Sequence, residues 1–280
     1  MTGFFKQADL MIKPVKFDRR WLGSSSVALY GVLVAWMMLI VVRPVHADLA
    51  DTIQRIKPAI VGIGTYQKTR SPPLNFLGTG FVVDDGLHII TNAHVVPELS
   101  SDIHKESLVI MTGSGDKPEL RAAKVVALEK EHDIALLQIE GTPLPTMKLG
   151  DSAVVREGQV LAFTGFPIGM VLGFYPVTHR ASIASITPII LPAFNARQLD
   201  ANKIHQLQRS AYKVFQLDGT AYPGNSGSPL YDQKTGVVYG VINMVFVKDK
   251  KESVLSNPSG ISYAIPGRHI MDLLQRHKRN

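Results

Sequence analysis

The chain has 280 residues, of which 45% are hydrophobic and 19% charged, with 23 glycines and 17 prolines. This is the composition of an ordinary globular protein, so it argues against disorder, collagen-like chains and repeat arrays. The length supplies core material for one large domain or two modest ones, and the lack of cysteine excludes disulfides and thiolate metal sites.

The first 47 residues differ from the rest. Basic residues are concentrated in residues 1–20, and an uncharged, mostly apolar stretch reaches from Trp21 to Val42. Small or modest residues follow at 45–47, where a signal peptidase would cut after Ala47. The segment predicts a cleaved export signal. The alternative is a hydrophobic N-terminal helix that stays in place as a membrane anchor, since residues 21–42 are enough to span about 30 Å of hydrocarbon.

Both interpretations place a domain of residues 48–280 outside the cytoplasm, in the periplasm or cell envelope. They also explain most of the formal net charge of +7, because residues 48–280 carry 24 Lys and Arg against 21 Asp and Glu. This domain has no basic stripe, so we expect no nucleic-acid partner.

Residues 48–280 begin with a short amphipathic helix at Asp51–Lys57, ended by Pro58, and then read mainly as short strands. The first set is expected at Ile60–Tyr66, Gly78–Val83, His88–Thr91, Leu108–Met111 and Ala122–Leu128. The second set is expected at Ile134–Ile139, Gln159–Phe163, Ala181–Ile186, Val214–Leu217, Val237–Phe246 and Ile261–Ala264. Two sets of strands with little helix between them predict an all-β protein made of two barrel-like halves.

Two segments have helical rather than strand spacing. Asp200–Lys213 is expected to be a helical insertion on a long loop. Pro266–Arg276 has an apolar face and predicts a C-terminal helix, followed by a frayed tail at His277–Asn280.

The most informative local pattern surrounds Ser226. Glycines at 224 and 227 allow a tight turn that exposes the serine hydroxyl and lets the backbone N–H groups of Gly224 and Ser226 converge as an oxyanion hole. The alternative is the nucleophile elbow of an α/β-hydrolase esterase. That elbow needs a helix after the serine, whereas Pro229 and the strand-like Val237–Phe246 follow here.

A serine nucleophile needs a base and a group that orients the base. Of the nine histidines, His94 lies where a strand runs into small residues, and a turn there would present the ring to a cleft. Asp133 enters an apolar strand, where a carboxylate is costly to bury without a partner such as a histidine Nδ1–H. The order His94, Asp133, Ser226 along the chain predicts a catalytic triad.

Several strings resemble those of the HtrA-type trypsin-like serine peptidases: TNAHVV at 91–96, HDIALL at 132–137, GFPIG at 165–169, PGNSGSPL at 223–230 and GISYAIP at 260–266. The resemblance covers roughly residues 50–275 and implies a chymotrypsin-like double β-barrel with the active site between the barrels. It also implies that His94 is the general base, Asp133 its orienting group and Ser226 the nucleophile.

The chain departs from this family pattern at three places. Ser228 stands where the family has a second glycine, and the segment 170–215 is longer than expected, which makes it a candidate for regulation. The family's peptide-binding PDZ domain is not expected after the C-terminal helix. The family resemblance also implies a possible homotrimer.

By the same resemblance, the pocket for the substrate residue before the scissile bond (P1) is lined by Thr220, Ala221, Tyr222 and Pro223 and by Val241–Met244, including Asn243. None of these residues is charged, and the nearby Asp218 is expected to be structural, so we expect a small or medium apolar P1 residue.

The predicted function is therefore a serine endopeptidase acting on unfolded or flexible polypeptides in envelope protein quality control or processing. The alternative is a catalytically weak, chaperone-like or peptide-binding protein on the same fold. Metal-ligand spacings are not recognisable, so no metal and no cofactor are expected.

Overall fold

The computed structural model describes residues 48–97, 106–115, 118–168, 173–188, 212–243 and 261–279. The predicted leader or anchor at 1–47 and most of the long segment 170–215 lie outside these residues. So does the predicted insertion helix Asp200–Lys213, except for its last two residues, of which Lys213 begins a strand. Among the described residues, no helix is both long enough and apolar enough to cross a membrane.

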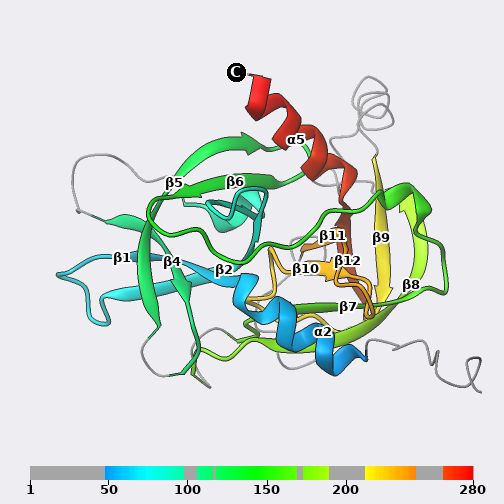
Figure 1. Cartoon of the computed structure of the whole chain (residues 1–280), viewed down its shortest axis with the longest axis horizontal. Coiled ribbons are helices and arrows are strands. Elements are labelled where there is room, and N and C mark those ends of the chain that lie inside the picture. Colours follow the sequence, from blue (N-terminus) through cyan, green and yellow to red (C-terminus); the bar gives the residue numbers. More distant parts are fainter. Residues whose placement is uncertain are drawn as a thin grey trace, which may run out of the picture. The chain divides into compact units, whose positions relative to one another are not determined.

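Twelve described strands form two closed antiparallel barrels, which confirms the predicted all-β double barrel (Figure 1). The first barrel has the strand order β1-β2-β3-β6-β5-β4 and the second has the order β10-β11-β12-β9-β8-β7. Closure pairs every strand on both sides, which removes exposed sheet edges. The strands are β1 Ile60–Tyr66, β2 Leu74–Val83, β3 His88–Thr91, β4 Ser107–Thr112, β5 Glu119–Glu129, β6 Ile134–Ile139, β7 Val160–Gly165, β8 Val177–Pro188, β9 Lys213–Asp218, β10 Pro229–Tyr231, β11 Val238–Asn243 and β12 Ile261–Pro266.

Two strands differ from the prediction: one belongs to the other barrel, and one was not predicted. Ile134–Ile139 was assigned to the second set, but as β6 it pairs with β3 and β5 and closes the first barrel. The short β10, Pro229–Tyr231, was not predicted, because three residues that begin with proline carry almost no strand signal. It completes the second barrel by pairing with β7 and β11.

Two buried clusters fill the molecule. The smaller one fills the second barrel with residues such as Leu161, Phe163 and Leu217. The larger one fills the first barrel and continues into the contact between the barrels, because it includes Phe166 and Val241 from the second half of the chain. The barrels therefore share part of one apolar core, which stabilises their contact.

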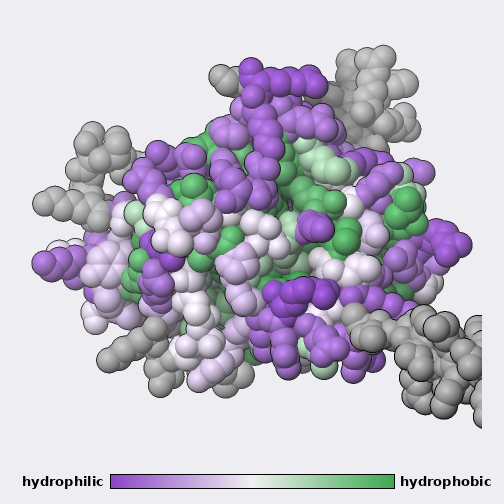
Figure 2. Space-filling view, in the orientation of Figure 1, coloured by the Kyte–Doolittle hydropathy of each residue, from purple (hydrophilic) through white to green (hydrophobic). Residues whose placement is uncertain are grey.

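Helices pack on the outside of the barrels. Helix α2, Leu49–Ile56, is capped by Asp48 and holds the β10–β11 turn through Thr52 Oγ1, which donates to Lys234 O over 3.0 Å. Helix α5, Arg268–Arg279, buries Ile270 and Leu273 and is helical through most of the predicted frayed tail. Figure 2 shows hydrophilic residues over both helices and apolar residues in the surface between them, as expected for amphipathic helices.

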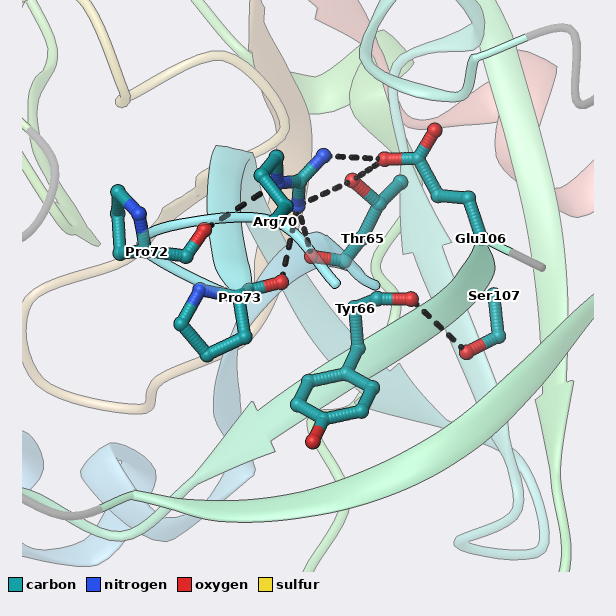
Figure 3. A network of polar contacts seen from close by, with 7 residues as sticks. All are labelled: Thr65, Tyr66, Arg70, Pro72, Pro73, Glu106 and Ser107. Carbon is teal, nitrogen blue, oxygen red and sulfur yellow. Dashed lines mark hydrogen bonds and ion pairs between the residues drawn. The ribbon is translucent and has the colours of Figure 1, made fainter. Parts of the chain in front are cut away.

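A polar network fixes the connection between β1 and β2. Arg70 lies in that connection, and its Nη1 forms an ion pair with Glu106 over 2.6 Å (Figure 3). Its Nη2 donates to Thr65 O over 2.9 Å and to Pro73 O over 3.1 Å. Thr65 Oγ1 also bonds Glu106. One guanidinium thus binds backbone oxygens at both ends of the connection, in β1 and just before β2.

Candidate active site

His94 and Asp133 are brought together by four hydrogen bonds. Asp133 Oδ2 lies 2.6 Å from His94 Nδ1, and Asp133 Oδ1 accepts from the His94 backbone N–H over 2.8 Å. The Asp133 carbonyl accepts from Asn92 Nδ2 over 3.0 Å and from the Ala93 N–H over 3.1 Å. The segment before and through His94 is therefore bound to both the backbone and the side chain of Asp133.

The backbone at Asp133 is unusual, with a φ of 53°. A residue with a Cβ disfavours this left-handed region, and strain of about 1–3 kcal/mol persists where the surroundings hold it in place. The four hydrogen bonds to Asn92, Ala93 and His94 supply that restraint at the entrance to β6.

The second barrel contacts the same carboxylate. Asn243, at the end of β11, is fully buried, and its Nδ2 donates to Asp133 Oδ2 over 2.6 Å. Since this oxygen accepts from Asn243, and a carboxylate oxygen can only accept, His94 Nδ1 carries the proton of the His94–Asp133 bond. In the neutral ring, His94 Nε2 is then the acceptor, the form that a general base requires.

Ser226 lies in the turn that precedes β10. Gly224 has a φ of 100° and Gly227 a φ of 88°, so both occupy positions that favour glycine. A Cβ on Gly227 would collide with the Thr79 carbonyl, which makes glycine necessary there on steric grounds as well. The predicted tight turn around the serine is thus present in the structure. Ser226 is buried within it, with 6% of the residue exposed, whereas the sequence predicted an exposed hydroxyl.

Thr79 of β2 holds this turn against the first barrel. Its N–H donates to Ser226 O over 2.9 Å, and its hydroxyl donates to Gly224 O over 2.7 Å. The same hydroxyl accepts from the Phe166 N–H over 3.1 Å, and Thr91 Oγ1 donates to Thr79 O over 2.7 Å. Thr79 is completely buried and uses its hydroxyl both as donor and as acceptor.

The His94 segment and the Ser226 turn also lie close together. A Cβ placed on Gly78 would be 3.0 Å from Ser226 O and 2.9 Å from Val95 Cγ2, so the backbone of β2 contacts both segments. Strand β11 makes a second connection, because Ile242 exchanges backbone hydrogen bonds with Gly227 and Ser228, directly before Asn243. The structure therefore gathers the His94–Asp133 pair and the Ser226 turn at the contact between the barrels.

Gly224 and Ser226 carry the candidate oxyanion donors. Within the described part of the chain, the N–H groups of Gly224 and Ser226 donate to no acceptor. The side chain of His94 is 30% exposed, whereas that of Asp133 is 17% exposed. The arrangement leaves the imidazole accessible and shields its carboxylate partner.

The predicted P1-pocket residues fall into three environments. Thr220 and Tyr222 are half-buried, and Ala221 is buried in the cluster that fills the second barrel. Val241 is fully buried in the larger cluster, opposite Pro229. Asn243 donates its side-chain hydrogen bond to Asp133. Asp218 ends β9 in register with Ser182 and Ile261, in line with a structural role.

Sequence reasoning missed Thr79 and the contact of Asn243 with Asp133. The signal for Thr79 was weak: a small polar residue between two glycines in a strand. Ser228, the departure from the family pattern, is fully buried, and its hydroxyl has no hydrogen-bond partner among the described residues.

Aromatic and titratable groups also gather beside Asp133. The ring of His132 stacks on that of His269 of α5 at 3.7 Å, and Tyr212 packs edge-on against His132 at 4.6 Å. Burial, together with the negative charge of Asp133 and its acidic neighbours, raises the pKa of Tyr212. Burial and the nearby His132 lower the pKa of His269 to about 4.

Two groups of side chains have the ligand types and spacing for a metal ion: Asp84, Asp85 and His88, and Glu129, Glu131 and His132. In each group the histidine Nδ1 already bonds a carboxylate of the same turn. The expectation that the protein needs no metal stays a prediction.

Comparison with known proteins supports the same family. The trypsin-like peptidase domain matches residues 78–241. Proteins described as probable periplasmic serine endoprotease DegP-like are 31% identical over 205 residues in Pseudomonas putida and 32% identical over 198 residues in Halomonas elongata. These alignments cover 73% and 70% of this chain but 35% and 34% of the relatives, so the chain spans about a third of their length.

Solved structures show the same fold. The HtrA-type protease AlgW with decapeptide has a TM-score of 0.60 at 21% identity, covering 83% of this chain and 68% of that one. A variant of AlgW with tripeptide has a TM-score of 0.58 at 22% identity, covering 81% and 62%. The resemblance expected from the sequence motifs is confirmed: the chain belongs to the trypsin-like peptidase family and is similar to HtrA-type proteases.

Proposed function

We propose that this protein is a serine endopeptidase in which His94, Asp133 and Ser226 act as the catalytic triad. The observation that carries the proposal is the doubly tethered His94–Asp133 pair, joined through Asn243 to the strand that binds the Ser226 turn. Family membership and relatives named as serine endoproteases support it.

In the proposed reaction, Ser226 Oγ attacks the peptide carbonyl while His94 Nε2 accepts its proton. Asp133 holds the ring in the required tautomer and stabilises the imidazolium that forms. The N–H groups of Gly224 and Ser226 donate to the developing oxyanion. His94 then protonates the leaving amine, and water hydrolyses the acyl-enzyme by the same route.

We further propose that the substrates are unfolded or flexible polypeptides and that the protein works in the cell envelope. The names of its relatives, which contain the word periplasmic, and the apolar N-terminal segment support this location. The segment serves either as a cleaved signal or as an anchor at residues 21–42. A homotrimer belongs to the same proposal, by analogy with the family. Mass determination of the protein from an envelope fraction would distinguish cleavage after Ala47 from anchoring.

The test compares the full chain with Ser226→Ala and with Ser228→Ala, a matched serine two residues away. We expect a fluorophosphonate to label the unsubstituted protein and Ser228→Ala but not Ser226→Ala, with casein digestion following the same pattern. Labelling that persists in Ser226→Ala would contradict the proposed nucleophile. Polypeptide binding without labelling or digestion would favour the chaperone-like alternative.

A further inference from the structure

The carbonyl oxygens of the Ser226 turn are held by hydrogen bonds, two of them from one residue. Thr79 Oγ1 donates to Gly224 O over 2.7 Å, and the Thr79 N–H donates to Ser226 O over 2.9 Å. Asn225 O, between these two carbonyls, accepts from the Ser228 N–H over 3.0 Å. Thr79 therefore binds the carbonyls of the same two residues whose N–H groups are the candidate oxyanion donors.

The peptide unit between Gly224 and Asn225 lies next to both candidate donors. The unit before it carries the Gly224 N–H, and the unit after it carries the Ser226 N–H. Gly224 has a φ of 100° and no Cβ, so the backbone there can adopt several conformations at little steric cost. A planar peptide unit moves as one body, so its orientation sets the direction of the chain on either side. Contacts rather than backbone sterics must therefore orient this unit.

Two hydrogen bonds supply that orientation. The Asn225 N–H donates to Tyr222 O over 2.9 Å at one end of the unit, and the Thr79 hydroxyl donates to Gly224 O at the other. The same hydroxyl accepts from the Phe166 N–H over 3.1 Å. Because an amide N–H can only donate, the single hydroxyl proton is directed to Gly224 O. Thr79 is fully buried, so water does not compete for this bond.

We propose that Thr79 is a positioning residue for the proposed reaction. Its hydroxyl orients the peptide unit between Gly224 and Asn225 and thereby aligns the N–H groups of Gly224 and Ser226 with the developing oxyanion. The inference rests on the proposed peptidase function and assigns to β2, in the first barrel, a part in a donor pair that belongs to the second half of the chain.

The experiment compares the full chain with Thr79→Val, which removes the hydroxyl but keeps a side chain of nearly the same shape. The substrate is a fluorogenic peptide that spans a site cleaved in casein. We expect kcat to fall by about 10- to 100-fold, less than the roughly 10²–10³-fold typical when an oxyanion donor is removed, because both N–H groups remain but are less well aligned. KM should stay within about twofold, since the oxyanion forms only in the transition state. Thr79→Ser, which restores the hydroxyl, should keep kcat within about threefold of the unsubstituted protein.

Thr52→Val is the matched control for a purely structural role. Thr52, on α2, is also fully buried, and its hydroxyl likewise donates to a backbone carbonyl, Lys234 O, over 3.0 Å. It also accepts from Arg55 Nη2 over 3.3 Å. Each valine variant loses the same kind of buried hydroxyl, so urea denaturation should show comparable losses of stability. Only Thr79→Val should lose kcat.

A folded Thr79→Val with unchanged kcat would overturn the inference, whether or not KM rises, and so would an equal loss of kcat in Thr52→Val. If Thr79→Val fails to fold, Thr79→Ser still tests the inference, because a folded serine variant with kcat lowered tenfold or more would show that the hydroxyl is not what matters. In all these cases the unsubstituted protein is labelled by the fluorophosphonate at Ser226. Absence of labelling and of cleavage in that protein would instead overturn the proposed function on which the inference rests.

Discussion

Two histidine–aspartate pairs in this molecule have nearly the same local geometry and very different surroundings. His94 Nδ1 lies 2.6 Å from Asp133, and His88 Nδ1 lies 2.8 Å from Asp85. Asp85 and His88 belong to one turn between β2 and β3, whereas Asp133 and His94 are 39 residues apart. The short distance is therefore common to both pairs and does not by itself indicate function.

The difference lies in what each carboxylate contacts. The Asp85 side chain is 49% exposed and bonds within its own turn, to His88 and to the Leu87 N–H. Burial alone would raise the pKa of Asp85, but these hydrogen bonds outweigh it and hold the pKa below its usual value. Asp133 is better shielded and accepts a hydrogen bond from Asn243 of the other barrel. The pair that connects the two barrels is the one suited to catalysis.

The largest expected effect comes from neutralising each aspartate in turn. Asp133→Asn should lower kcat by about 10³–10⁴-fold, because an amide donating to His94 Nδ1 favours the tautomer that cannot accept the serine proton. The matched variant Asp85→Asn should change kcat by less than about twofold, since it alters one surface turn. Peptide hydrolysis by both variants measures this, and equal losses would remove the functional distinction between the pairs.

The contact from the second barrel should have an intermediate effect. Asn243→Leu keeps the approximate side-chain volume but removes the donor to Asp133 Oδ2. A hydrogen bond to a charged group contributes about 1.5–3 kcal/mol, so we expect kcat to fall by roughly 10- to 100-fold. Asn75→Leu, at an exposed position of β2, serves as the control. A kcat within error of the unsubstituted protein would show that Asp133 is oriented by the first barrel alone.

The smallest expected effect is on stability rather than on rate, and it concerns His269 beside the Asp133 turn. Its pKa is about 4 in the folded protein, against an ordinary value of 6.5. The unfolded chain therefore binds more protons between these values, and the free energy of unfolding falls as pH drops from 6.5 to 4. The contribution of this group is at most roughly 3 kcal/mol.

Urea denaturation of the full chain between pH 4 and 7 measures this slope. The groups that face His269 are His132, Tyr212, Glu129, Arg268 and Arg276, and they remain in the His269→Gln variant. That variant should show a shallower dependence on pH. The same slope in both proteins would assign the acid sensitivity to other groups.

Much of the architecture followed from local patterns. The strand segments were predicted because short runs of β-branched and apolar residues between turn residues are typical of closed barrels. The grouping of Ile134–Ile139 was wrong, because chain order does not reveal which barrel a strand closes. Strand β10 was missed because pairing with β7 and β11, rather than its own propensity, makes it a strand.

By itself, the sequence determined the fold class, the family, the glycine-dependent turn around Ser226 and the candidate triad, because these depend on local backbone chemistry and on motif order. Tertiary structure alone decided which groups surround them. The anchoring of the Ser226 turn by Thr79 and the bond from Asn243 to Asp133 join residues far apart in the chain. The contact between Thr79 and Gly224 spans a separation of 145 and that between Asn243 and Asp133 one of 110. Such contacts arise when two barrels close and pack, and no local pattern encodes them.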